Sequence, residues 1–274
     1  MCIRDRYKGR EITAVIPALN EEQSLGLVID ELFELQVCSD CSKLTHSNAD
    51  RLSHTTASVS VAVCSCSGPI ERQKVVDQII VCNNGSTDNT ASIAADRGAI
   101  VTDEPERGYG AACLAALAVP VSKDIIVFVD ADHSVVADEL PQLIEPLFDK
   151  ADLVIGSRTL GNTEKGALSI PQAFGNRLAT GLIRLLWNEK TTDLGPFRAV
   201  SNKTLEELGM SDRRFGWTVE MQVATIQQSK VTVEVPVSTR QRIGKSKISG
   251  TVRGVFAAGH GILGTIFKMY WSGR

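Results

Sequence analysis

The feature that most constrains the fold of this chain is the alternation of short apolar runs with segments of helical periodicity. Three of these runs are almost wholly apolar and lie at Glu11–Pro17, Val75–Cys82 and Asp124–Val129. Continuous apolar strands are typical of parallel sheets covered on both faces, because each such strand is buried on both sides. The alternation therefore predicts an α/β fold, in which one domain has a mostly parallel central sheet with helices on both faces.

The same alternation predicts the remaining elements. Asn20 is expected to cap the first helix, whose apolar residues recur between Leu25 and Leu35. Further helices are expected at Asp88–Arg97, Gly110–Ala118, Asp138–Phe148, Pro171–Trp187, Asn202–Leu208, Thr218–Gln228 and Gly254–Tyr270. Further strands are expected at Ala99–Asp103, Ala151–Ser157, Phe197–Ser201 and Val231–Val237.

Composition and charge narrow the class of protein. Hydrophobic residues make up 43% and charged residues 22% of the 274 residues, as in ordinary folded proteins. The formal net charge of −3 gives no reason to expect a nucleic-acid partner. Because the chain has no long apolar run and no apolar core of a signal peptide at its start, we expect a cytoplasmic protein.

One long segment, Cys38–Lys74, interrupts the alternation. It is polar, rich in Ser and Thr and without clear periodicity, so we expect an insertion that is disordered or weakly packed. Four thiolates from Cys38, Cys41, Cys64 and Cys66 could instead surround a zinc ion. The CxC spacing of the second pair is not usual for such a site, so we favour incidental thiols.

Polar segments follow four of the expected strands, at Pro17–Glu22, Asn83–Asp88, Asp103–Gly110 and Asp130–His133. Ligand sites of open parallel sheets form beyond the carboxyl ends of the strands, so we expect these segments to converge. In the last of them two carboxylates stand one residue apart, and they would repel each other unless a cation lies between them. A hard divalent ion, Mg²⁺ or Mn²⁺, suits carboxylate and diphosphate oxygens. A helix-capping Asp beside a solvated acid is the simpler alternative.

An ordered set of motifs makes the chain resemble family 2 glycosyltransferases of the GT-A fold. The motifs are VIPALNEE (Val15–Glu22), NNGSTD (Asn83–Asp88), ERGYGAA (Glu106–Ala112), DAD (Asp130–Asp132), DLGPFRAV (Asp193–Val200) and RIGKSKISG (Arg242–Gly250). The last is similar to a basic loop of the branch that includes the polyprenyl-phosphate hexosyltransferases. The resemblance covers residues 11–250, which implies a GT-A domain there and leaves residues 251–274 as a C-terminal helix.

The resemblance also implies roles for individual residues. A nucleotide-binding role falls to Pro17, Asn20, Glu22, Asn83, Asp88 and Asp130. Asp132, together with Asp130, would ligate the metal, and Glu220 would be the catalytic base. A phosphate-binding role, for donor or acceptor, falls to Arg198, Arg242, Lys245 and Lys247. The chain departs from the family in having Asn83 in place of Asp, and in having Ser134 where the branch often has a metal-binding Gln. His133 is a candidate for that third ligand.

The resulting hypothesis is a metal-dependent, inverting transfer of a hexose from a UDP- or GDP-linked donor. A hydroxyl acceptor would require a base, for which Glu220 is the candidate, whereas a polyprenyl-phosphate acceptor is already anionic and requires none. The segment Arg240–Arg253 carries basic residues without an acid, and an apolar helix follows it. These two elements could meet a membrane surface that presents the acceptor, or the helix could pack on the domain or on a second subunit. A sugar nucleotidyltransferase and an inactive nucleotide-sugar-binding protein are the alternative functions.

Overall fold

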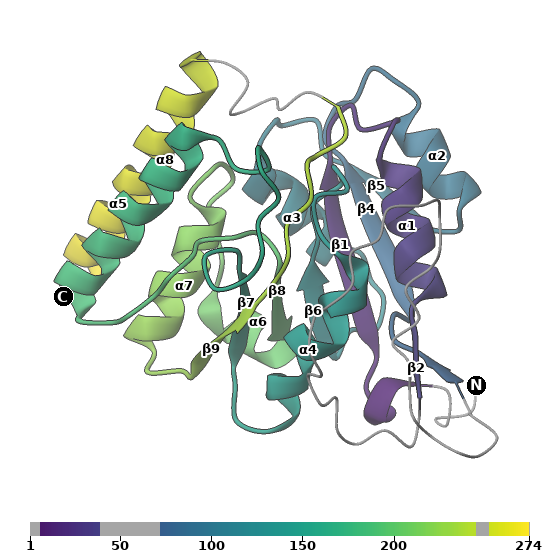
Figure 1. Cartoon of the computed structure of the whole chain (residues 1–274), viewed down its shortest axis with the longest axis horizontal. Helices are drawn as coiled ribbons and strands as arrows, with labels where there is room; N and C mark the ends of the chain where they lie inside the picture. Colours follow the sequence, from purple (N-terminus) through teal and green to yellow (C-terminus); the bar gives the residue numbers. More distant parts are fainter. Residues whose placement is uncertain (1–5, 39–71, 245–251, 274) are drawn as a thin grey trace.

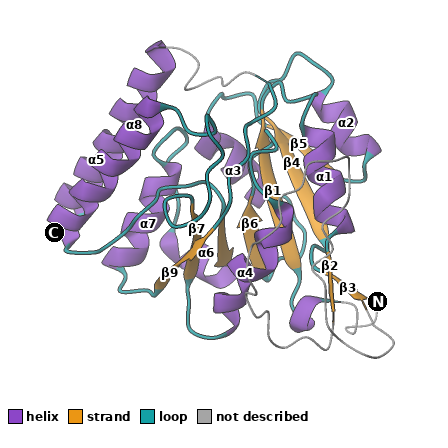
Figure 2. Cartoon of the chain, viewed as in Figure 1, coloured by secondary structure: helices purple, strands orange, loops and turns teal. Residues whose placement is uncertain are grey.

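The computed structural model describes residues 6–38, 72–244 and 252–273 of the chain. These residues contain a seven-stranded sheet with the strand order β5-β4-β1-β6-β8-β7-β9 (Figures 1 and 2). Of the six pairs of neighbouring strands in it, four are parallel and the two that include β8 are antiparallel. The predicted α/β fold with a mostly parallel sheet is therefore confirmed.

The strands coincide closely with the apolar runs of the sequence. They are β1 (Ile12–Ala18), β4 (Gln78–Asn83), β5 (Ile100–Asp103), β6 (Ile125–Phe128), β7 (Leu153–Ser157), β8 (Arg198–Ser201) and β9 (Thr232–Pro236). Because β8 is reversed, its amino end lies at the same edge of the sheet as the carboxyl ends of β6 and β7. This is the edge at which open α/β sheets bind ligands.

Helices cover both faces of the sheet, as predicted. One face carries α1 (Leu25–Glu34), α2 (Thr90–Asp96) and α4 (Leu140–Ile144), and the other carries α3 (Tyr109–Leu117), α6 (Asn202–Leu208) and α7 (Trp217–Gln227). Alternating side chains of β1 separate the two cores, because Ala14 and Ile16 pack into the first core and Val15 into the second.

A third layer lies outside α7. It consists of α5 (Ile170–Trp187) and α8 (Val252–Ser272), which lie side by side (Figure 1). Ile183 of α5, Val223 of α7 and Ile266 of α8 meet in a small apolar core. The C-terminal helix therefore packs on the domain, which was one of the alternatives for it. None of the described helices is long and apolar enough to span a bilayer.

Two local predictions were wrong. The helix expected at Asp138–Phe148 is divided into 3-10 turns on either side of α4, since Pro146 cannot donate the hydrogen bond that would continue it. Asn20 does not cap α1, which begins after Ser24. It instead adopts a left-handed backbone (φ 53°), and its side-chain oxygen accepts a hydrogen bond from the backbone of Thr87.

The predicted insertion begins and ends in a short antiparallel ribbon of β2 (Gln36–Cys38) and β3 (Arg72–Lys74). Residues 39–71, which connect these two strands, lie outside the described residues. The weak packing predicted for Cys38–Lys74 therefore concerns mostly residues that the structure does not describe. The possible zinc site at Cys38, Cys41, Cys64 and Cys66 also stays a prediction, since the last three of these cysteines lie outside the described residues.

Asn84 joins two of the loops at the ligand-binding edge. Its buried side-chain amide donates to the carbonyls of Glu104 (2.9 Å) and Glu106 (2.7 Å) and accepts from the backbone N–H of Gly108 (2.8 Å). A single side chain thus satisfies three backbone groups of the loop after β5 and sets the approach to α3.

We predict that Asn84→Ala lowers the free energy of unfolding by about 2–3 kcal/mol, because buried backbone groups are left without partners. The matched control is Asn89→Ala, which removes an exposed amide bonded to Glu22 and should change stability by about 0.5 kcal/mol or less. Urea unfolding of both variants measures the difference, and equal stabilities would contradict this role of Asn84.

Candidate active site

A cavity of about 170 Å³ opens at the edge of the sheet where β6, β7 and β9 end and β8 begins. Two carboxylates, Asp130 and Asp132, and two guanidinium groups, Arg158 and Arg242, line it. The loop before α5 and its first turn close one side through residues that include Ser169 and Gln172. The cavity therefore combines acidic and basic groups at the position where the fold favours a ligand.

The two carboxylates follow the buried strand β6 directly. Burial, and then the neighbouring charge of Asp132, raise the pKa of Asp130. One oxygen of Asp132 accepts from the backbone of Ser134 (3.0 Å), and the other pairs with Arg242 (3.3 Å). The hydroxyl of Tyr109 is buried near Asp130, and burial followed by the charge of Asp130 raises the pKa of Tyr109 as well. A further positive charge at this place would relieve the repulsion.

Asp130 and Asp132 fit a hard divalent cation, since both offer oxygen ligands at the mouth of a partly enclosed cavity. Among the described residues there is no group of three or more His, Cys, Asp or Glu side chains that could hold a metal. The protein would therefore fill only part of the coordination sphere of Mg²⁺ or Mn²⁺. Phosphate oxygens of a ligand and water are the ligands that such ions accept in addition.

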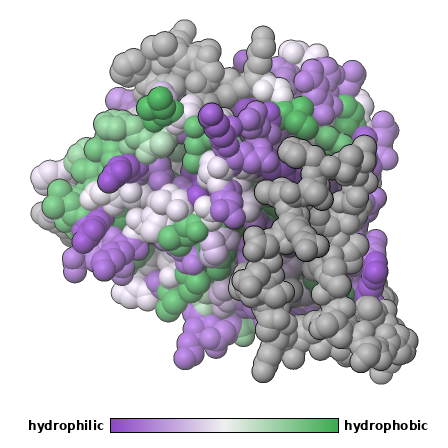
Figure 3. All heavy atoms as spheres, viewed as in Figure 1, coloured by the Kyte–Doolittle hydropathy of each residue, from purple (hydrophilic) through white to green (hydrophobic). Residues whose placement is uncertain are grey.

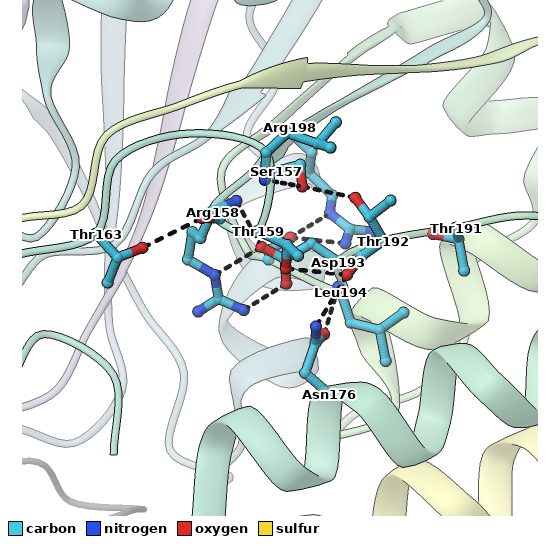
Figure 4. Close-up of polar contacts among 12 residues, drawn as sticks. Ser157, Arg158, Thr159, Thr163, Asn176, Thr191, Thr192, Asp193, Leu194 and Arg198 are labelled. Carbon is cyan, nitrogen blue, oxygen red and sulfur yellow. Dashed lines mark hydrogen bonds and ion pairs between the residues drawn. The ribbon is translucent and has the colours of Figure 1, made fainter. Parts of the chain in front are cut away.

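A buried carboxylate, that of Asp193, fixes the orientation of Arg158 (Figure 4). Its Nε and Nη2 donate to the two oxygens of Asp193 at 2.8 and 2.7 Å, and its backbone N–H donates to the same carboxylate (2.8 Å). Asp193 is almost completely buried, whereas Arg158 is partly exposed and reaches the cavity. A planar bidentate pair of this kind holds the guanidinium group in one orientation.

The segment that carries Asp193 is itself held from two sides. Glu234 of β9 accepts from the backbone N–H and the hydroxyl of Thr192, at 2.9 and 2.8 Å. Asn176 of α5 donates to the carbonyl of Thr192 (3.0 Å) and accepts from the backbone of Leu194 (2.9 Å). The position of Arg158 therefore depends on contacts with both a strand and a helix.

Arg242 connects the two halves of the sheet edge. Besides Asp132 it pairs with Glu21 in the loop after β1 (3.1 Å). Its segment runs along the loop after β6, since Ile243 donates to the carbonyl of Asp132 and Arg240 to that of Ser134. Arg242 thus lines the cavity, and its predicted role in binding phosphate stays a prediction. Lys245 and Lys247, which were assigned with it, lie outside the described residues.

The residues assigned to the nucleotide form a network at the ends of β1 and β4. Asn20 accepts from Thr87, and Glu22 exchanges hydrogen bonds with the second loop through Asp88 and Asn89. Asn83 donates to Asp103 at the end of β5 (2.7 Å). None of these residues, nor Pro17, is among those that line the cavity. The structure brings them together beside it, and Arg242 with Glu21 provides the connection.

Three candidates lie away from the ligand cavity. Arg198 is fully buried, and its guanidinium group donates to the carbonyls of Gly195 and Thr218 at 2.7–3.0 Å, so it supports the cavity floor and does not reach a phosphate there. His133 contacts Glu31 and Arg240, both at 2.9 Å, and so faces α1 and not the cavity. Both side chains therefore face away from the cavity, and their predicted roles stay predictions.

Glu220 also has a structural role. It lines a different pocket, beside α8, and its carboxylate accepts from the backbones of Ser211 and Asp212. The loop that it holds packs on the start of α3, where a Cβ at Gly110 would lie 1.9 Å from the carbonyl oxygen of Asp212. Glu220 therefore lies outside the cavity, and its role as a base stays a prediction.

Comparisons with known proteins agree with this architecture. The model of the family described as "Glycosyl transferase family 2" matches residues 70–209. An uncharacterized glycosyltransferase of Mycobacterium tuberculosis is 36% identical over 186 residues, which cover 65% of this chain and 81% of the relative. A dolichyl-phosphate hexose transferase of Haloferax volcanii is 26% identical over 269 residues, which cover 96% of this chain and 95% of the relative.

Among solved structures, this chain resembles a glucosyl-3-phosphoglycerate synthase from M. tuberculosis, crystallised with Mn²⁺, uridine diphosphate and phosphoglyceric acid. The TM-score is 0.64 at 22% identity, and the match covers 96% of this chain and 79% of the other. At this level of identity the likeness establishes a shared fold, which agrees with the GT-A fold expected from the motifs.

We predict that Asp193→Ala lowers the free energy of unfolding by about 3 kcal/mol, because it leaves the mostly buried Arg158 cation and its backbone N–H without their partner. Arg158→Met in the same chain should recover part of this loss. The control is Asp30→Ala, which breaks the exposed pair with Arg97 and should cost about 1 kcal/mol or less. Chemical denaturation of the four proteins tests this, and a double variant no more stable than Asp193→Ala would contradict it.

Proposed function

The chain belongs to glycosyl transferase family 2 and is a glycosyltransferase, and we propose that it transfers a hexose from a nucleoside-diphosphate sugar to a polyprenyl phosphate. The observation that carries this proposal is the cavity in which Asp130 and Asp132 stand with Arg158 and Arg242. Acidic groups that suit a divalent cation beside basic groups that suit phosphate are what a diphosphate donor requires.

The donor half of the site is assigned to the loops after β1, β4 and β6. Asp130 and Asp132 would hold Mg²⁺ or Mn²⁺, which would neutralise charge on the diphosphate as it leaves. The nucleoside would lie across the network of Asn20, Asn83 and Asp88, beside Pro17. The structural neighbour was crystallised with Mn²⁺ and uridine diphosphate, which supports the proposal of a divalent metal and a nucleoside diphosphate.

The acceptor half of the site is assigned to Arg158 and Arg242. An acceptor phosphate oxygen would attack the anomeric carbon on the face opposite the diphosphate. The new carbon–oxygen bond forms as the old one breaks, the bonding electrons leave with the nucleoside diphosphate, and the configuration inverts. A phosphate acceptor is anionic before it attacks, so no base is required, which agrees with the position of Glu220 outside the cavity.

The full-length relative from H. volcanii is named for a dolichyl-phosphate acceptor, and this supports a lipid phosphate. A hydroxyl acceptor is the alternative within the same family, and it would need a carboxylate base in the cavity. A nucleotidyltransferase would use the same metal site but would attack phosphorus and release pyrophosphate. The released product therefore distinguishes the two classes of reaction.

We predict that Asp132→Asn abolishes metal-dependent donor binding and reduces turnover by about a thousandfold or more, because it removes a metal ligand and a charge. The fold should survive, since this carboxylate is at a strand end. Asp149→Asn, which changes an exposed acid outside the site, is the matched control. The measurement is calorimetric titration with UDP- and GDP-linked hexoses in Mn²⁺ or in chelator. Full binding by Asp132→Asn would refute the assignment.

We also predict that Glu220→Gln retains transfer to a short-chain polyprenyl phosphate within about threefold of the unmodified enzyme, since a phosphate needs no base. Arg158→Gln should reduce the same transfer by about a hundredfold, because it removes a charge-assisted phosphate contact. Chromatography of the released nucleotide and NMR of the product's anomeric centre give the reaction class. Release of pyrophosphate, or activity that depends on Glu220 and not on Arg158, would contradict the proposal.

A further inference from the structure

The third layer of the fold presents a large apolar surface to solvent. On α5, Ile170, Phe174 and Leu185 are 85%, 68% and 77% exposed, and Leu178 is 42% exposed. These residues recur at spacings of four, four and seven, so they lie on a single face of the helix. The opposite face carries Ala179 and Ile183, which are buried in the core with α7 and α8. The helix is therefore apolar on two faces, of which the domain covers one.

The neighbouring helix extends this surface. On α8, Phe267 and Trp271 are exposed, whereas Ile266 is fully buried. The rings of Trp187 at the end of α5 and Tyr270 of α8 meet at 5.7 Å, so the two helices lie together over their last turns. Figure 3 shows hydrophobic residues gathered over this part of the molecule. Monomeric proteins rarely leave such a surface without a partner.

The charged residues on the two helices are of one sign. Arg177 and Arg184 are exposed on α5, spaced seven residues apart beside the apolar face. Neither α5 nor α8 contains an acidic residue, although the whole chain has a net charge of −3. A helix face with aromatic and aliphatic residues flanked by arginines is typical of elements that lie in the surface of an anionic bilayer.

The surface begins at the mouth of the cavity. Ser169, which caps α5, and Gln172 in its first turn line the cavity. Ile170 and Phe174, in the first two turns of the same helix, are exposed. From these observations we propose that α5, with the end of α8, docks on an anionic membrane surface. This inference rests on the proposed function: a lipid phosphate held by Arg158 and Arg242 would have its chain directed along the apolar face of α5 into the bilayer.

The charges disfavour a second copy of this chain as the occupant. A two-fold contact through this face would bring Arg177 and Arg184 of both copies into one interface. Neither of the helices supplies an acid to pair with them. Phosphate groups of lipids, in contrast, provide the opposite charge at the depth where arginine side chains end.

The test is co-sedimentation of the full chain, without donor, with vesicles of phosphatidylcholine alone and with an equimolar mixture of phosphatidylcholine and phosphatidylglycerol. We expect binding to the anionic vesicles that weakens in high salt. The double variant Phe174→Glu with Leu185→Glu should reduce the partition coefficient by about tenfold or more. The control Leu27→Glu adds one such charge at an exposed leucine of α1 and should bind as the unmodified protein does.

A second variant tests the charges separately. Arg177→Gln with Arg184→Gln should weaken binding to the anionic vesicles by about fivefold for each arginine and reduce its dependence on salt. This variant keeps the apolar face, so loss of folding would not account for its effect. If the double glutamine variant binds the anionic vesicles as tightly as the unmodified protein does, the inference is overturned.

The remaining measurements separate this inference from the proposed function. The double glutamate variant should bind donor with Mn²⁺ normally and transfer to a short, water-soluble polyprenyl phosphate normally, but should lose transfer to a long-chain acceptor embedded in vesicles. Absence of vesicle binding with intact donor binding overturns the docking surface alone. A dimer of the unmodified protein that the double variant dissociates, observed by analytical ultracentrifugation, would identify a second copy as the occupant and also overturn it.

Discussion

The site is organised by the electrostatic cost of two carboxylates at the end of a buried strand. Burial and mutual repulsion raise the pKa of Asp130, so the surrounding chain must supply positive charge. Arg158 and Arg242 supply it, but each of these cations then needs a partner in turn. Asp193 and Glu21 provide these partners from opposite sides of the site. The charge pairs thus extend from the centre of the sheet into both of its halves.

The two branches differ in how firmly the fold holds them. The Arg158 branch ends on a buried carboxylate whose segment is fixed by Glu234 and Asn176. The Arg242 branch is held by two partly buried ion pairs and by two backbone hydrogen bonds. Displacing Arg242 therefore breaks fewer buried contacts than displacing Arg158 does. The structure offers one rigid wall at β7 and β8 and one wall that ligands can rearrange more readily.

The apolar pattern of the sequence predicted most of the fold. Each strand of the main sheet was placed within about three residues, because buried parallel strands are apolar without interruption. In the site, the rule that ligands gather at carboxyl ends of strands correctly placed Asp130 and Asp132. The same rule would have found Arg158, which follows Ser157 at the end of β7, but no motif directed attention to it.

What the sequence could not show was the orientation of side chains. Arg198 and Glu220 have suitable chemistry at motif positions, yet their side chains face backbone groups elsewhere.

Roles that depend on distant partners also escaped the sequence. Asn84, Asn176 and Glu234 are polar residues without a distinguishing pattern, and each acquires its function by satisfying backbone groups of a loop that tertiary packing brings to it. Such contacts cannot be derived from spacing, because the partners of Asn84, Asn176 and Glu234 are 16–42 residues away in the sequence.

The apolar helices show a further limit of sequence patterns. The basic segment and the C-terminal helix were expected to form any membrane-facing surface, because the apolar residues there follow positive charge. Ile262, Leu263 and Ile266 of α8 instead pack on the third-layer core. In contrast, α5 is apolar on two opposite faces, which by periodicity alone indicates a fully buried helix. One of these faces is exposed, because the described residues form no further layer outside α5. Periodicity identifies an apolar face but not what covers it, and only the packing of α5 and α8 shows which of their apolar residues remain exposed.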